Sequence, residues 1–120
     1  MDGHYPDQVP IEAYGNGGFR FAGMSHRGSL LCLPSGIYGW EAPAAIDTAS
    51  LSRVLDEADG IEVLLVGTGR DLVPLAPDLR QALRERSIVA EAMSTGAAVR
   101  TFNVLLAESR AVAAALIAVA

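Results

Sequence analysis

Two short segments combine glycines, hydroxyl side chains and arginines in a pattern that could bind an anion. The first, Gly67–Arg70, reads Gly-Thr-Gly-Arg and directly follows the apolar run Ile61–Val66. The second, Ser94–Arg100, begins with Ser-Thr-Gly and ends in an arginine. A glycine-rich turn after a buried parallel strand is a frequent phosphate-binding position in α/β folds. The candidate crevice residues are therefore Gly67, Thr68, Gly69, Arg70, Ser94, Thr95 and Arg100.

The strands that precede these segments explain how the two could meet. We expect the strands ending at Val66 and Glu91 to be parallel, so that both following loops emerge at the carboxyl edge of the sheet. Arg70 and Arg100 could then face one anion, with the threonine and serine hydroxyls as further donors. A structural role is the alternative. The glycines would then serve a tight turn, and the hydroxyl of Ser94 or Thr95 would only cap a helix. Arg100 would pair with a nearby acid.

The first loop shares part of the dinucleotide-binding fingerprint and departs from it twice. Leu72 occupies the third glycine position. Pro74 and Pro77 delay the following helix, so that its first amides cannot point at the glycines. We therefore expect no nucleotide cofactor.

Other residues that often do chemistry lack a supporting pattern. His4 and His26 are far apart in predicted loops, and no histidine or cysteine spacing is typical of a metal site. No base is recognisable beside a nucleophile, as a hydrolytic triad requires. The single cysteine, Cys32, lies in the apolar run Leu30–Leu33 and is expected to be a buried, inert thiol. We expect no metal, can name no catalytic residue, and favour a protein without catalytic activity.

The first forty residues have the period-two pattern of β-strands. Residues 1–8 are polar and patternless, which indicates a loose lead-in. Asn16-Gly17 between alternating residues predicts a hairpin, because both residue types adopt positive φ at little cost. His26–Gly28 is interpreted as a turn before the strand Ser29–Leu33, and another turn leads into the strand Ile37–Trp40.

The remaining residues alternate between helix and strand patterns. We expect helices over 49–56, 77–86 and 95–109, and strands over 61–66, 87–91 and 111–119. The strands 61–66 and 87–91 have the spacing of a βαβ unit and should be parallel neighbours or nearly so. The order predicts one α/β domain over 9–120: a layered mixed β-sheet with helices and an N-terminal β-meander.

Composition narrows the class of protein and of partner. The chain has 120 residues, 51% of them hydrophobic, and a net charge of −5. This balance disfavours nucleic acid as a partner, and the cluster Arg80–Arg84–Arg86 is interpreted as a solvated helix face. No apolar stretch is long enough for a transmembrane helix or resembles a secretory signal. The lone cysteine fits a reducing compartment, so we expect a cytoplasmic location, and the apolar surplus suggests a homo-oligomer.

Four later segments and three earlier ones together resemble a known family. They are Ile61–Gly69, Leu79–Arg84, Ser94–Leu105 and Glu108–Ile117, with Phe19–Phe21, Gly28–Leu31 and Gly36–Trp40 upstream. The family is a small, uncharacterised α/β family of stand-alone bacterial and archaeal proteins, and it includes a mitochondrial assembly factor of respiratory complex I. The similarity extends from about Ile11 to the C-terminus.

The resemblance implies a mixed sheet layered with helices, and no established catalytic activity for the bacterial members. It favours a non-enzymatic interaction or assembly protein whose partners are components of a respiratory complex. The alternative function is a small-ligand or anion-binding protein, or an enzyme, that uses the crevice at the carboxyl edge of the sheet.

Overall fold

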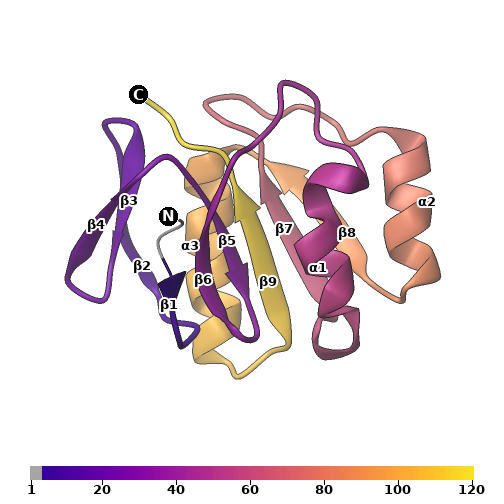
Figure 1. Ribbon diagram of the computed structural model, residues 1–120, viewed down its shortest axis with the longest axis horizontal. Coiled ribbons are helices and arrows are strands. Elements are labelled where there is room, and N and C mark those ends of the chain that lie inside the picture. The colour runs from indigo at the N-terminus through magenta and orange to yellow at the C-terminus, as the bar shows by residue number, and fades with distance from the viewer. Residues whose placement is uncertain (1–3) are drawn as a thin grey trace.

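A parallel pair of buried strands lies at the centre of the fold and positions both candidate loops. The computed structural model describes residues 4–120 (Figure 1). In it, β7 (Val63–Gly67) and β8 (Val89–Met93) pair in parallel, with Leu65 opposite Glu91. Their connection contains α2 (Pro77–Glu85), which starts at the proline that the sequence predicts as its first residue. The predicted βαβ unit is confirmed, although its second strand begins and ends two residues later than the expected 87–91.

The larger of two sheets combines parallel and antiparallel strands. The third parallel strand, β9 (Val112–Leu116), lies on the other side of β7 and pairs antiparallel with β5 (Ser29–Leu33). In residues 4–120 the order of this six-stranded sheet is β1-β6-β5-β9-β7-β8. Its two remaining strands are β1 (His4–Tyr5) and β6 (Gly36–Trp40). The mixed sheet of the predicted α/β fold class is confirmed.

Helices cover both faces of the large sheet. One face packs against α1 (Ser52–Asp56), its flanking turns η1 (Ala49–Leu51) and η2 (Ala58–Gly60), and α2. The other face packs against α3 (Thr95–Ala107), which lies behind the sheet in Figure 1. The predicted helices are confirmed, although the first one begins as a 3₁₀ turn and the third ends two residues early.

Both faces of β9 are apolar, because this strand lies in the middle of the sheet. Val112, Ala114 and Leu116 join the core beneath α3, whereas Ala113 and Ala115 join the core beneath α1 and α2. All five are buried. The near-continuous apolar pattern of the chain's last strand follows from this two-sided burial.

A second, three-stranded sheet completes the layer that contains α3. It has the order β2-β3-β4, with β2 (Ile11–Gly15), β3 (Gly18–Phe21) and β4 (Met24–Arg27). The predicted hairpin at Asn16-Gly17 is confirmed, with φ of 53° and 80°. Ala22-Gly23 form a second two-residue turn with φ of 51° and 73°.

Two expectations for the N-terminal half are wrong. His26 and Arg27 lie in β4 rather than in a turn, and the change of direction falls on Gly28, whose φ is 98°. The loose lead-in is wrong for His4–Tyr5, which form β1 and pair antiparallel with Tyr38 and Ile37 of β6. Residues 1–3 lie outside the described residues.

Asn103 fixes the small sheet to α3. Its Oδ1 accepts the N–H of Ile11 at 2.9 Å, and its Nδ2 donates to the carbonyl oxygen of Ile11 at 2.9 Å. At the other end of the hairpin, the N–H of Gly17 donates to the carbonyl oxygen of Val119 at 2.7 Å. The first two bonds hold the start of β2 against the later turns of α3, and the third joins the hairpin turn to the segment after β9, next to the candidate loops.

Candidate functional site

The two candidate loops are in direct contact at the carboxyl edge of β7 and β8. The N–H of Thr68 donates to the carbonyl oxygen of Met93 at 2.8 Å. The N–H of Thr95 donates to the carbonyl oxygen of Gly69 at 2.8 Å. The parallel strands therefore bring the two loops together at one edge, as the sequence pattern predicts.

The hydroxyl of Thr95 is committed to the backbone of two other segments. Thr95 is fully buried. Its Oγ1 accepts the N–H of Gly69 at 3.0 Å and donates to the carbonyl oxygen of Ile117 at 2.7 Å. The carbonyl oxygen of Gly67 in turn accepts the N–H of Ile117 at 2.9 Å. One side chain thus joins the start of α3, the turn after β7 and the segment after β9.

Thr68 has a comparable role in the first loop. Its Oγ1 lies 2.7 Å from the carbonyl oxygen of Asp71 and 3.1 Å from that of Met93, and it accepts the N–H of Val73 at 2.9 Å. The hydroxyls of both threonines are therefore occupied by the fold. The hydroxyl of Ser94 caps α3 by accepting the N–H of Ala97 at 3.4 Å, so its own proton is still available for donation. Of the three hydroxyl groups expected to donate to an anion, it is the one that can do so.

The two glycines of the first loop have different physical roles. A Cβ on Gly67 would lie 2.9 Å from the Cα of Thr95, so close packing against the second loop requires glycine. Gly69 has a φ of 106°, a conformation that L side chains rarely adopt. Both therefore serve the tight junction described above.

A crevice of about 260 Å³ lies beside this junction. Of the seven predicted residues it contains Gly69, Arg70, Ser94 and Arg100. Gly67, Thr68 and Thr95 lie outside it and support its wall. The lining residues that sequence reasoning missed are Tyr14, Gly96, Ala97, Val119 and Ala120.

Tyr14 reaches the crevice from β2 and lies against the first turn of α3. A Cβ on Gly96 would collide with the hydroxyl and ring of Tyr14. A glycine in the first turn of a helix is a sequence signal for such a close approach. The signal does not name the partner, because the partner comes from a distant strand.

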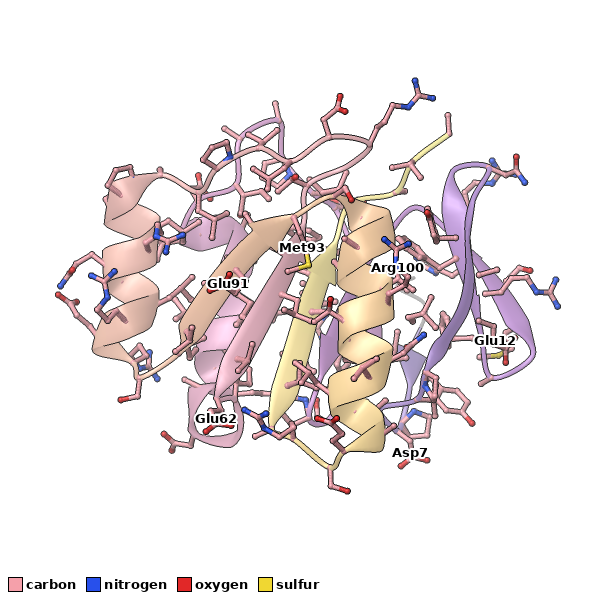
Figure 2. All side chains as sticks on the ribbon, turned by 180° about the vertical axis from the view of Figure 1, so that it is seen from behind. Asp7, Glu12, Glu62, Glu91, Met93 and Arg100 are labelled. Atoms are coloured by element: carbon pink, nitrogen blue, oxygen red, sulfur yellow. The ribbon has the colours of Figure 1, made fainter. Side chains whose placement is uncertain are left out.

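Two arginines give the crevice its charge. Arg70 lies in the loop after β7. Arg100 lies on α3, as Figure 2 shows. Both are exposed, and within residues 4–120 neither guanidinium has a carboxylate partner. The arrangement can attract an anion from solvent, with the start of α3 nearby.

The remaining candidates for chemistry are accounted for by the core and by backbone contacts. Cys32 is fully buried, as expected, and burial raises the pKa of its thiol to about 12. His26 lies on β4, where its Nε2 is 3.3 Å from the carbonyl oxygen of Ser29. Helix α2 begins only at Pro77, after an extended segment, so its first amides do not follow Gly67–Gly69 directly.

Residues 11–117 match the model of a family described as a protein of unknown function, DUF498/DUF598. The chain belongs to this family. The match covers the small sheet, the large sheet from β5 onward and all three helices, and the family resemblance seen in the sequence is confirmed.

Relatives of this DUF498/DUF598 member include one uncharacterised protein and several assembly factors. The chain is 40% identical over 109 residues to an uncharacterised Rhodobacter capsulatus protein, covering 91% of this chain and 84% of that protein. It is 34% identical over 121 residues to mouse NADH dehydrogenase [ubiquinone] 1 alpha subcomplex assembly factor 3. That match covers 98% of this chain, which spans 64% of the mouse protein.

Solved structures share the fold closely. A crystal structure of a Bartonella henselae protein, described as an outer membrane protein, is 61% identical with a TM-score of 0.92, covering 98% of this chain and 100% of that one. A Bordetella pertussis protein described as a Mth938-like domain is 29% identical with a TM-score of 0.80, covering 92% and 86%. Within residues 4–120 of the chain itself, none of the helices has the length and apolar character needed to cross a bilayer.

Replacing Thr95 with Val keeps the shape of the side chain and removes its hydroxyl. The N–H of Gly69 and the carbonyl oxygen of Ile117 then lose a partner at a buried position, so the free energy of unfolding should fall by about 1–3 kcal/mol. Urea denaturation followed by circular dichroism measures the change. Arg70→Ala and Arg100→Ala are matched controls at exposed positions beside the same junction and should leave stability nearly unchanged. Wild-type stability in Thr95→Val would contradict the structural role of this hydroxyl.

Proposed function

We propose that this chain is a protein-interaction module that assists the assembly of a multi-subunit complex, with respiratory complex I as the candidate client. The observation that carries the proposal is the 34% identity to the mouse assembly factor across 98% of this chain. That alignment spans every strand and helix, so the similarity concerns the whole fold rather than one motif. Its partners would be protein subunits, and its location would be cytoplasmic.

The site geometry supports binding through surfaces. The threonine hydroxyls that could serve a ligand are used to join the loops, and the only thiol is buried and protonated. Accessible polar groups at the carboxyl edge include the guanidinium groups of Arg70 and Arg100 and the hydroxyl of Ser94. Self-association of the chain is a further part of the proposal, with a concentration-dependent mass in light scattering as its signature.

Deleting the gene in its source organism tests the proposal directly. We expect less assembled complex I on native gels and lower NADH:ubiquinone oxidoreductase activity in membranes, with both restored by the tagged full chain. Tagged protein captured from a native lysate should carry subunits of the same complex. Normal complex I levels in the deletion strain, together with no captured respiratory subunit, would refute the proposal.

Anion binding in the crevice is the second candidate function. The observation that favours it is the presence of Arg70 and Arg100 in one crevice of about 260 Å³, neither of them paired with a carboxylate within residues 4–120. Two guanidinium groups without internal partners are suited to a phosphate or carboxylate ligand.

Calorimetric titration with inorganic pyrophosphate tests this second function. Arg70→Ala and Arg100→Ala should each weaken binding roughly tenfold, because each removes a charge-assisted hydrogen bond, while the melting temperature stays the same. Arg27→Ala on β4 is the matched control and should bind like the wild type. Identical affinity in all four proteins, or no measurable binding, would exclude the crevice as an anion site.

A further inference from the structure

The two ends of the large sheet differ in how much strand they leave open. At one end, the described part of the chain contributes the two residues of β1. At the other end β8 has five residues and, within residues 4–120, pairs only with β7. A strand at the end of a sheet presents unpaired backbone groups to any extended chain that can approach it.

The hydrogen bonds of β8 show which of its residues face outward. The N–H of Val89 donates to the carbonyl oxygen of Glu62 at 3.0 Å, and the carbonyl oxygen of Met93 accepts the N–H of Thr68 at 2.8 Å. In a parallel ladder every second residue makes both of its bonds to the same neighbour. The intervening residues Ala90 and Ala92 therefore direct their N–H and C=O groups away from β7.

The two faces beside this edge differ in charge. On the side of α3, Val89 is 57% exposed and Glu91 is exposed, because α3 packs mainly against β7 and β9 rather than β8 (Figure 2). On the side of α2, the exposed Arg80 and Arg84 are one helical turn apart and overhang the small side chain of Ala90. A hollow of about 90 Å³ lies between them and the strand.

We propose that the β8 edge binds an extended acidic segment of a partner protein as an additional strand. The inference rests on the proposed interaction function and names the surface and the chemistry of its partner. A partner residue paired with Ala90 places its side chain on the α2 face. A carboxylate at that position reaches the guanidinium groups of Arg80 and Arg84, and main-chain bonds to Ala90 and Ala92 supply the register.

Charge distinguishes this partner from a second copy of the chain. Antiparallel pairing of two β8 strands about a two-fold axis keeps both α2 helices on the same face of the joined sheet. Arg80 and Arg84 of both copies would then approach one another without an acidic partner between them. Edge arginines oppose pairing with a neutral or cationic strand. The same arginines favour a strand that carries carboxylates at the matching positions.

A synthetic peptide of sequence Thr-Val-Glu-Val-Glu-Val-Thr is a suitable probe, because its two glutamates lie on one face of an extended strand. Binding of the labelled peptide to the intact chain is measured by fluorescence anisotropy. The same peptide with glutamine in place of glutamate isolates the contribution of charge. We expect the acidic peptide to bind at least about tenfold more tightly than its glutamine analogue.

Three variants locate the binding surface. Arg80→Glu/Arg84→Glu should weaken binding of the acidic peptide more than about tenfold, whereas Arg20→Glu/Arg27→Glu, with the same change in net charge on the small sheet, should not. Ala92→Pro should also weaken it, because proline removes an outward N–H without breaking the ladder to β7. Arg80→Gln/Arg84→Gln replaces the reversal variant if circular dichroism shows that the latter is unfolded. Equal loss in both double variants, or no peptide binding at all, would overturn the proposal.

The failure of this inference can be separated from the failure of the proposed function. If Arg80→Glu/Arg84→Glu captures respiratory subunits as well as the wild type does, the assembly function stands and the β8 edge is overturned as its surface. If the deletion strain assembles complex I normally, the assembly function fails whatever the peptide does. If the wild type is a dimer and Ala92→Pro converts it to a monomer, the β8 edge binds a second copy of the chain. That result would overturn the proposal of an acidic partner.

Discussion

The hydroxyl of Thr95 is the contact on which the carboxyl edge of the sheet depends. It accepts the N–H of Gly69 in the turn after β7 and donates to the carbonyl oxygen of Ile117 after β9. Thr95 is also the first residue of α3. Three segments that are distant in sequence therefore meet at one buried atom. This constraint explains the two glycines. Gly67 allows Thr95 to approach closely, and Gly69 turns the chain with a positive φ.

This junction separates residues that build the edge from residues that remain accessible to a partner. Glycine N–H groups and threonine hydroxyls in α/β loops often contact phosphate groups, but here the glycine backbone and the threonine hydroxyls bond the loops to one another. The accessible groups are the exposed arginines of the crevice and the outer side of β8. A rigid scaffold with its polar chemistry at the surface is consistent with a protein that acts by binding other proteins.

Local signals predicted the elements well and predicted contacts between distant elements poorly. The apolar run before Gly67 and the proline at the start of α2 were sufficient for the βαβ unit, and Asn16-Gly17 for the first hairpin. The turn at Ala22-Gly23 was missed because alanine rarely adopts a positive φ. The division into two sheets, and the approach of β2 to the crevice, depend on tertiary packing that no local pattern encodes. The same hydroxyl residues suit a ligand or a loop junction, so residue type alone could not decide between the two roles.

Amide hydrogen exchange of the free chain, followed by NMR, tests directly the claim that the loop junction is part of the core and the β8 edge is open. The N–H of Gly69, bonded to the buried Thr95, should exchange only with near-global unfolding. Along β8, the outward N–H of Ala92 should exchange about two orders of magnitude faster than that of Glu91, which faces β7. Rapid exchange at Gly69, or equal protection of Ala92 and Glu91, would contradict the account.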